Sequence, residues 1–251
     1  MEKLDTIKNE FKICPINDID YIIDKYSNDT RASVKALVNK AIKQKEKYNE
    51  ELVRIENMRC YEKQYSSYSA ICGIDEVGRG PLAGPVIAAA VVLPGDCIIP
   101  YVNDSKKLTE KKREELYDEI YDKALAVGIG QVEHDVIDSI NILQATYEAM
   151  RIAISKLEVE PDILLNDAVT IPQVSIKQVP IIKGDAKSIS IASASIIAKV
   201  TRDRLMVEYD KIYPEYDFAS NKGYGSKNHI EALKLFGPTP IHRKSFIKNF
   251  I

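Results

Sequence analysis

The chain has 251 residues, of which 45% are hydrophobic and 29% are charged, proportions typical of a folded globular protein with a sizeable core. Its 35 basic and 37 acidic residues leave a formal net charge of -2, so any attraction to nucleic acid must come from a local surface. The four cysteines show no metal-ligand spacing, and the longest uncharged run, residues 81–95, is too short to span a membrane, so we expect a reduced cytoplasmic chain without zinc, disulfides or a signal peptide.

Residues 1–66 differ from the rest of the chain because they lack glycine, mix both charges and show a helical period. We expect Asp29 to cap the N-terminus of a long helix. One face of this helix carries apolar residues: Val34, Leu37, Ala41, Tyr48, Leu52 and Ile55. Lys43, Lys45 and Lys47 are most simply a solvated face, and a duplex-binding surface is the alternative. The pattern predicts a helical N-terminal extension over residues 1–66.

From residue 69 onward, short β-rich segments alternate with helices, and we predict one further domain over residues 69–251. Two of the predicted strands, Ile71–Ile74 and Val86–Val92, flank a glycine-rich loop, a spacing that favours an antiparallel hairpin. Thr109 is the predicted N-cap of a helix over residues 110–123.

The second half of this domain continues the alternation. Strands are predicted over residues 125–132, 163–167 and 174–182, and helices from about residue 141 and around residue 194. Pro180 places its strand near a sheet edge, since proline cannot donate to a neighbouring strand. The run Ile191–Ser195 is rich in small residues, which permits close packing of its helix on the sheet.

Two adjacent carboxylates, Asp75 and Glu76, follow the first apolar strand directly. Such a pair is costly to bury unless a cation or a proton neutralises it, so a hard divalent metal is its natural partner. Gly78 and Gly80 flank Arg79 and let the backbone approach a ligand closely. The stretch indicates chemistry on a phosphate, and an ordinary strand-to-loop turn with solvated acids is the alternative.

The stretch Gly73–Val86 resembles the opening signature of ribonuclease HII, the bacterial type 2 ribonuclease H. Six later segments are similar to that family in the same order: Asp104–Leu108, Leu164–Asp167, Lys183–Asp185, Ala194–Asp203, Lys222–Gly225 and Gly237–Phe246. The resemblance implies an α/β fold of the ribonuclease H type, a mixed sheet flanked by helices, and it leaves only the helical N-terminal extension unexplained.

The family's four catalytic, metal-binding acids carry over to Asp75, Glu76, Asp167 and Asp185. Four such carboxylates can hold two Mg²⁺ or Mn²⁺ ions, one activating a water and one stabilising the departing 3′ oxygen. Asp167 and Asp185 taken singly are ordinary turn residues, and their significance comes from occurring with the Asp75-Glu76 pair. Asn166 departs from the family, which usually has an apolar residue there, so the packing beside Asp167 is an open question.

The resemblance also implies a substrate-binding surface. Gly78, Arg79 and Gly80 correspond to the loop that reads the ribose 2′-OH, the group that separates RNA from DNA. Tyr224 corresponds to an aromatic that stacks on the neighbouring sugar, although a lone tyrosine is more often a surface or core filler. Further residues are expected to meet phosphate, although such lysines are commonly just solvated: Ser105, Lys106, Lys107, Lys199 and Arg202.

The C-terminal segment supplies local positive charge. From Ala219 onward, Glu231 is the single acid beside six basic residues: Lys222, Lys227, Lys234, Arg243, Lys244 and Lys248. This surface suits a nucleic acid partner. His229 and His242 have no metal spacing, and we assign them no catalytic role.

The resemblance therefore implies a cytoplasmic, monomeric, metal-dependent endoribonuclease. It would cut the RNA strand of RNA–DNA hybrids, and single ribonucleotides embedded in DNA duplex, on the 5′ side of a ribonucleotide, leaving 3′-hydroxyl and 5′-phosphate ends. Three alternatives stay open: ribonuclease HIII, which carries a β-rich N-terminal platform; a nucleotide-binding protein, for which the P-loop lysine is missing; and a non-catalytic nucleic-acid-binding module.

Overall fold

The computed structural model describes residues 2–251 as two compact units, one ending at Asn57 and the other beginning at Met58. The first unit is helical, as predicted. Its elements are α1 (Leu4–Ile13), the short η1 (Ile16–Asp18), α2 (Ile19–Tyr26) and most of α3 (Ala32–Met58). A small apolar core holds them together, made by Ile7, Ile22, Tyr26, Val34 and Val38.

The predicted N-cap at Asp29 is wrong. Helix α3 begins at Ala32, and the Asp29 carboxylate instead accepts hydrogen bonds from the backbone N–H and the guanidinium of Arg31 at 2.9 Å. Asp29 therefore closes the turn before the helix. Among the three lysines of the predicted solvated face, Lys45 pairs with Asp20, whereas Lys43 and Lys47 are exposed.

The second unit contains a five-stranded mixed sheet with strand order β3-β2-β1-β4-β5. The strands are β1 (Ile71–Val77), β2 (Val86–Val92), β3 (Ala126–Val132), β4 (Ile163–Asp167) and β5 (Lys177–Ile181). Strand β1 runs antiparallel to β2 and parallel to β4, which confirms the predicted hairpin. The strand that contains Pro180 lies at the edge, also as predicted.

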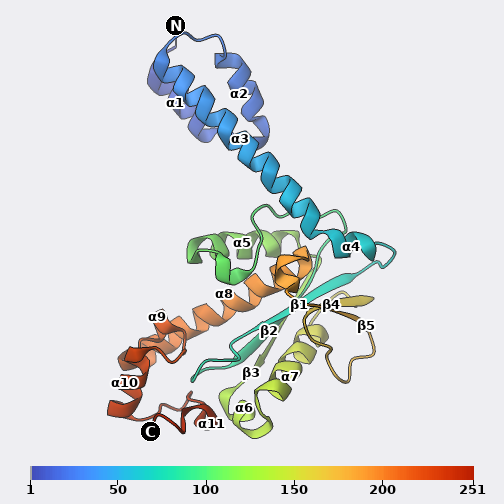
Figure 1. Ribbon diagram of the computed structural model, residues 1–251, viewed down its shortest axis with the longest axis vertical. Helices are drawn as coiled ribbons and strands as arrows, with labels where there is room; N and C mark the ends of the chain where they lie inside the picture. The colour runs from blue at the N-terminus through green and yellow to red at the C-terminus, as the bar shows by residue number, and fades with distance from the viewer. Residues whose placement is uncertain (1) are drawn as a thin grey trace. The chain divides into compact units, whose positions relative to one another are not determined.

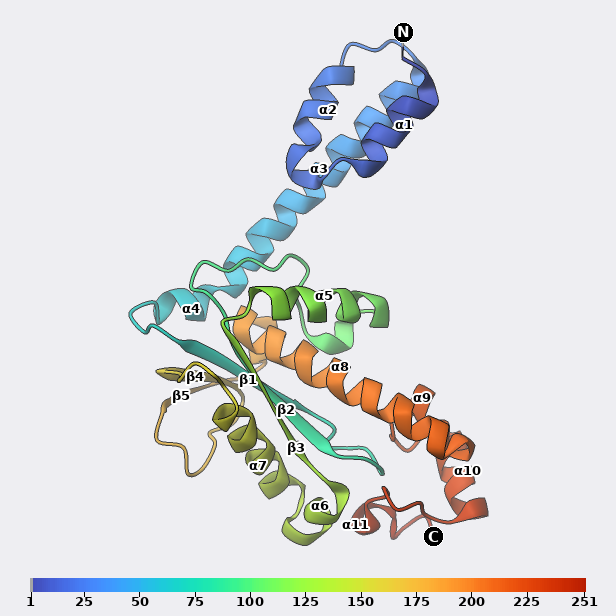
Figure 2. The same ribbon diagram turned by 180° about the vertical axis from the view of Figure 1, so that it is seen from behind.

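Helices cover both faces of the sheet (Figures 1 and 2). Helix α7 (Ile142–Ser155) lies on one face, with α6 (His134–Ile140) beside it. Helix α8 (Ile189–Ile212) lies on the other, and α5 (Glu110–Lys123) packs against α8. The predicted cap of α5 is confirmed, since the Thr109 hydroxyl accepts the Lys112 N–H.

The remaining short elements are η2 (Ser105–Lys107), η3 (Gly184–Ala186), η4 (Pro214–Tyr216), α9 (Phe218–Asn221), α10 (Lys227–Phe236) and α11 (Lys244–Ile247). The elements after α8 enclose a separate apolar cluster around Tyr216, Phe218 and Leu233. This cluster also includes Leu82 and Ala83, so it ties the C-terminal segment to the loop between β1 and β2.

Glycines let both layers of helices approach the strands closely. A Cβ atom on Gly73 of β1 would lie 2.1 Å from the backbone carbon of Ser190 in α8. On the other face, a Cβ on Gly130 of β3 would lie 1.8 Å from the carbonyl oxygen of Ala149 in α7. The predicted close packing of the small-residue start of α8 is therefore confirmed, and the sheet strand contributes an equally small partner.

Residues 58–66, which the sequence analysis assigns to the extension, lie in the second unit. Helix α4 (Cys60–Gln64) carries the buried Glu62, whose Oε1 accepts hydrogen bonds from the Ser188 hydroxyl at 2.5 Å and the Ser190 N–H at 3.1 Å. Ser188 is the N-cap of α8, so the Glu62 side chain accepts hydrogen bonds at the start of that helix. These contacts explain why the division between the units precedes α4.

All four cysteines are free thiols. None of the helices within residues 2–251 is long and apolar enough to cross a membrane.

Candidate active site

Strand alternation places two of the predicted acids on one face of the sheet. Ile74 of β1 pairs with Asn166 of β4, and the two strands are parallel, so the residues that follow, Asp75 and Asp167, lie side by side where β4 ends. Both point to the α8 side, because Ile71 and Ile163 of the same parity pack with Ile191 there. Asp75 is buried. Strand β1 continues to Val77, so its predicted end at Ile74 is too early and Asp75 and Glu76 lie within the strand.

The other two acids are brought to the same place by loops. The N–H of Gly184 donates to Asp167 Oδ1 at 2.7 Å, which docks η3 on the end of β4 and sets Asp185 beside Asp167. Glu76 lies next to Asp75 and forms an ion pair with Arg79 at 3.3 Å. The structure thus gathers the four predicted acids from three separate segments.

Burial and mutual repulsion disfavour the charged forms of these acids. Burial, then Glu76 and Asp167, raise the pKa of Asp75 well above its usual value, and a hydrogen bond with Ser195 opposes this in part. Burial also raises the pKa of Glu76, against the opposing effect of Arg79. Burial followed by Asp104 and Asp167 raises the pKa of Asp185. The raised pKa values show that the positive side chains nearby do not fully balance the negative charge of these carboxylates.

Some of these acids form hydrogen bonds or ion pairs with other side chains of the protein. Among residues 2–251, no three Asp, Glu, His or Cys side chains form a group arranged to hold a metal ion. Asp185 hydrogen-bonds to Asp104, and Glu76 pairs with Arg79. The donor set itself, several carboxylates whose negative charge is under-compensated, is the one that hard divalent cations such as Mg²⁺ and Mn²⁺ prefer. The residues therefore fit such an ion in their chemistry.

An open depression of about 510 Å³ lies over part of this cluster. It is lined by Asp104, Lys106, Lys107, Asp167, Lys183 and Asp185, among others. Lys106 is exposed and attracts both Glu76 and Asp185 electrostatically. Lysines at the rim of the depression add local positive charge, which attracts the phosphates of nucleic acids in general.

The predicted phosphate contact at Ser105 is wrong. Ser105 is buried, and its hydroxyl lies 3.0 Å from the hydroxyl of Ser195, which in turn hydrogen-bonds to Asp75. The two serines therefore support Asp75 from behind. Sequence reasoning missed Ser195 and Asp104 as parts of the site. Asp104 could have been predicted from the sequence, because it begins the Asp-Ser-Lys-Lys segment.

Arg202 is likewise unable to meet phosphate, because it is fully buried. Its guanidinium donates to the backbone carbonyls of Pro85 at 2.9 Å, Ala83 at 3.0 Å and Lys222 at 2.8 Å. Burial lowers the pKa of Arg202 to about 10. Lys199 is half-buried and forms an ion pair with Asp203 at 2.7 Å, so its ammonium already has a partner.

The glycine-rich loop and the predicted stacking residue are neighbours. A Cβ atom on Gly80 would lie 3.6 Å from Cε1 of Tyr224, whose side chain is exposed. The N–H of Leu82 donates to the carbonyl of Gly223 at 2.8 Å, which joins the two turns. Gly78 has a positive φ of 92°, and a Cβ there would lie 2.3 Å from Nε of Arg202, so glycine is required.

The burial of Arg243 and Asn166 bears on two further expectations from the sequence. Arg243 is fully buried and adds nothing to the basic C-terminal surface. Asn166, the departure from the family pattern, is also fully buried, and its Nδ2 donates to Val169 O and to Gln178 Oε1 at 2.8 Å. An amide pair thus fixes the loop after β4, without contact to the acids.

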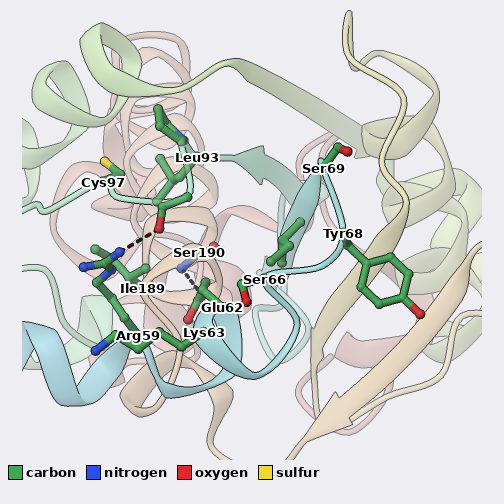
Figure 3. Close-up of a pocket in the computed structure, with 13 residues that line it drawn as sticks. Arg59, Glu62, Lys63, Ser66, Tyr68, Ser69, Leu93, Cys97, Ile189 and Ser190 are labelled. Atoms are coloured by element: carbon green, nitrogen blue, oxygen red, sulfur yellow. Dashed lines mark hydrogen bonds between the residues drawn. The ribbon is translucent and has the colours of Figure 1, made fainter.

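A second cavity, of about 330 Å³, lies at the opposite end of β1 and contains none of the predicted site residues (Figure 3). Ile71, Leu93 and Ile189 form its apolar walls, and Arg59 reaches across it to the carbonyl of Gly95 at 2.6 Å. The gathered acids lie at the open depression, which is therefore the candidate active site, and none of them lines this more enclosed cavity.

The fold and the gathered acids place the chain in the ribonuclease H class of nucleases. A ribonuclease H2 from Pyrococcus horikoshii OT3 superposes with a TM-score of 0.60 at 30% identity, covering 70% of this chain and 93% of that one. A ribonuclease HIII solved in complex with Mn²⁺ shares the fold at 15% identity, with a TM-score of 0.52, 67% of this chain covered and 63% of that one.

Sequence comparison narrows the class to a family. The family model described as ribonuclease HII matches residues 72–249, and the model of the ribonuclease HII N-terminal domain matches residues 3–66. A ribonuclease HII from Lachnoclostridium phytofermentans is 64% identical over 247 residues, covering 98% of this chain and 97% of that relative. The chain belongs to the ribonuclease HII family.

Membership makes the protein an endonuclease of the type 2 ribonuclease H class, whose enzymes act on RNA–DNA hybrids. The predicted family and fold class are confirmed. The two family models together, and the relative from Lachnoclostridium phytofermentans, match almost the whole chain to ribonuclease HII. These matches decide against ribonuclease HIII and against a nucleotide-binding or non-catalytic protein.

Proposed function

We propose that this endonuclease depends on a divalent metal and cuts on the 5′ side of a ribonucleotide, in RNA–DNA hybrids and at single ribonucleotides embedded in DNA duplex. The products carry 3′-hydroxyl and 5′-phosphate ends, and the role is to remove misincorporated ribonucleotides from DNA in the cytoplasm. One observation carries the proposal: four acids from three segments gather beside a glycine-rich loop that lies next to an exposed tyrosine.

Asp75, Glu76, Asp167 and Asp185 would hold Mg²⁺ or Mn²⁺. The chemistry that such an ion would supply when bound is activation of the attacking water and stabilisation of the departing 3′ oxygen. The chain's own contribution is to fix the acids: the buried Ser195 hydroxyl orients Asp75, and the Gly184 N–H orients Asp167. A ribonuclease HIII of the same fold was solved in complex with Mn²⁺, which supports this class of ion by analogy of fold.

Substrate recognition in this proposal is divided between two elements. Backbone groups of Gly78, Arg79 and Gly80 hold the 2′-OH, and the ring of Tyr224 packs on the following sugar. The exposed Lys106 and Lys107 at the rim of the depression meet the phosphates.

The proposal is tested with labelled duplexes that carry one ribonucleotide, a run of ribonucleotides, or none. With Mg²⁺ added, the first two should be cut on the 5′ side of a ribonucleotide and the third left intact, and chelation should stop cleavage. Cleavage of the all-DNA duplex, or activity that survives chelation, would contradict the proposal.

Tyr224→Ala is expected to lower cleavage at a single ribonucleotide about tenfold or more, because removal of an aromatic stack costs about 1 to 3 kcal/mol. Tyr224→Phe keeps the ring face and is expected to stay within about twofold of wild type. Single-turnover rates on the same duplex measure both variants. Equal rates for all three proteins would remove Tyr224 from the site.

A further inference from the structure

All three nitrogens of the Arg243 guanidinium donate hydrogen bonds to the loop between β1 and β2. The side chain is fully buried, and its three nitrogens donate to the carbonyls of Gly78 at 2.6 Å, Arg79 at 3.0 Å and Gly84 at 2.9 Å. Burial, then the neighbouring charge of Arg202, lower the pKa of Arg243 to about 9, so the guanidinium stays charged at neutral pH. The buried cation is stabilised by these carbonyl dipoles and by the ring of Phe246, whose centroid lies 5.2 Å from the guanidinium carbon.

These bonds determine where the loop's donors point. In a trans peptide unit the C=O and the N–H point in opposite directions, and the peptide bonds of residues 2–251 are trans. Because Arg243 draws the carbonyls of Gly78 and Arg79 inward, the N–H groups of Arg79 and Gly80 point away from the protein. Gly78 is buried, whereas Arg79 and Gly80 are exposed. Arg243 thereby presents two backbone donors to a ligand.

The preceding residue, His242, holds the other recognition element through a second histidine. The Thr239 N–H donates to His242 Nδ1 at 2.9 Å, so the proton of His242 is on Nε2. His242 Nε2 lies 2.9 Å from His229 Nε2, which must then accept, and His229 Nδ1 donates to the carbonyl of Tyr224 at 2.8 Å. The chain of bonds therefore runs from Thr239 to the backbone of Tyr224.

Both histidines are neutral in this arrangement. Burial lowers the pKa of His229, and burial together with His229 lowers the pKa of His242 to about 4. Both histidines are buried, and the aromatic rings of Tyr216 and Phe218 pack against them. At neutral pH each ring has one donor and one acceptor, which is what the chain of bonds requires.

The segment that carries His242 and Arg243 is itself tied to the loop it supports. The N–H of Arg243 donates to the carbonyl of Leu82 at 2.8 Å, and the N–H of Gly84 donates to the carbonyl of Ile241 at 2.9 Å. Figures 1 and 2 both show the end of the β1–β2 hairpin beside the C-terminal segment.

We propose that His242 and Arg243 are the two arms of one brace: Arg243 orients the donors of the Gly78–Gly80 loop, which both ribonucleotide substrates need, and His242 positions Tyr224, which favours a ribonucleotide followed by DNA. Neither residue touches the substrate. The inference rests on the proposed function, since it assigns the two braced elements to the 2′-OH and to the following sugar.

Two variants of His242 separate the brace from general packing. In Gln the terminal amide lies near the place of Nε2, so His242→Gln keeps a donor toward His229. In Asn the amide lies near the place of Nδ1, so His242→Asn keeps the bond from Thr239 but cannot reach His229. The readout is the ratio of single-turnover cleavage at a lone ribonucleotide to cleavage of a continuous RNA–DNA hybrid, where every following sugar carries a 2′-OH.

We expect His242→Asn to lower this ratio about tenfold, and His242→Gln to keep it within about twofold of wild type. In a Tyr224→Ala background, His242→Asn should not lower the ratio further, because both changes act through the same ring. An unchanged ratio in folded His242→Asn, or an additive effect with Tyr224→Ala, would overturn the brace.

Arg243→Lys tests the other arm. Lysine keeps the charge but cannot reach three carbonyls, so cleavage of both ribonucleotide substrates should fall about tenfold, with their ratio unchanged. Equal activity of folded Arg243→Lys and wild type would remove that arm. If Arg243→Lys does not fold, the His242 pair still decides the proposal.

A spectroscopic measurement separates failure of the brace from failure of the proposed function. Ring ¹⁵N shifts of the wild-type protein at neutral pH should show His242 protonated on Nε2 and His229 protonated on Nδ1, whatever the substrate. Other tautomers would overturn the brace directly. Correct tautomers in a protein that cuts no ribonucleotide-containing duplex would support the brace's geometry and contradict the function proposed for the surface it holds.

Discussion

Asp75→Asn is expected to lower single-turnover cleavage at least about a thousandfold at saturating Mg²⁺, about 4 kcal/mol in activation free energy, while the protein stays folded. Asparagine keeps the volume of the side chain and removes a charge that the metal requires. Asp185→Asn should behave alike. Turnover near the wild-type rate in either variant would exclude these acids from catalysis.

Stability provides an independent readout of the same change. Burial and the nearby carboxylates raise the pKa of Asp75, so its charged form costs the folded state free energy. The cost is absent at low pH, where Asp75 is protonated in both states, and it grows as the pH rises from the pKa of the unfolded chain through the raised pKa of the folded protein. Without metal at neutral pH, Asp75→Asn should therefore unfold at the same or a higher temperature than wild type.

Added Mg²⁺ should raise the unfolding temperature of wild type and have less effect on Asp75→Asn, because a ligand stabilises only the state that binds it. Glu160→Gln, a change of the same charge at an exposed residue before β4, serves as the control and should leave both activity and metal response unchanged. An equal response to Mg²⁺ in wild type and Asp75→Asn would contradict the metal site.

Gly73→Ala is expected to lower the free energy of unfolding by about 3 kcal/mol or more, because the added methyl group meets backbone atoms of α8. The added Cβ would lie 2.1 Å from the Ser190 backbone carbon and 2.4 Å from the Ile191 nitrogen. Backbone cannot move aside as a side chain can, so α8 must separate from β1. Urea unfolding of the second unit measures the loss.

Gly95→Ala is the matched control, because a Cβ there would meet no heavy atom within 4 Å. It should change the free energy of unfolding by less than about 1 kcal/mol. Since Gly73 lies two residues before Asp75, Gly73→Ala should also reduce cleavage in whatever fraction remains folded. Similar stability of both alanine variants would show that α8 does not pack on β1 as described.

Several features of the fold were predictable from the chain alone because their causes are local. Apolar runs predicted the strands, the spacing between Ile71–Ile74 and Val86–Val92 predicted an antiparallel hairpin, and Pro180 predicted an edge. The family could be identified from motifs in the same order along the chain, because short segments with fixed residue types can be read without knowing the three-dimensional structure. The helical nature of residues 2–57 followed from periodicity in the same way.

Other features depended on partners far away in the chain. Arg202 and Arg243 read as surface charge in the sequence, but both are fully buried on carbonyls of the β1–β2 loop, more than a hundred residues away. Ser105 read as a phosphate contact and proved to be a buried neighbour of Ser195. Composition cannot reveal burial of this kind, because a charged group becomes buried only where tertiary packing supplies its acceptors.

The sequence by itself therefore determined the strands, the helical extension, the family and the identity of the four candidate acids, all of which follow from local pattern or from motif. Only the tertiary structure decided that α4 belongs with the second unit and that His229 and His242 link Thr239 to Tyr224. The physical reason is that hydrogen-bond partners across a fold are set by packing in three dimensions, whereas periodicity and turn chemistry act over only a few residues.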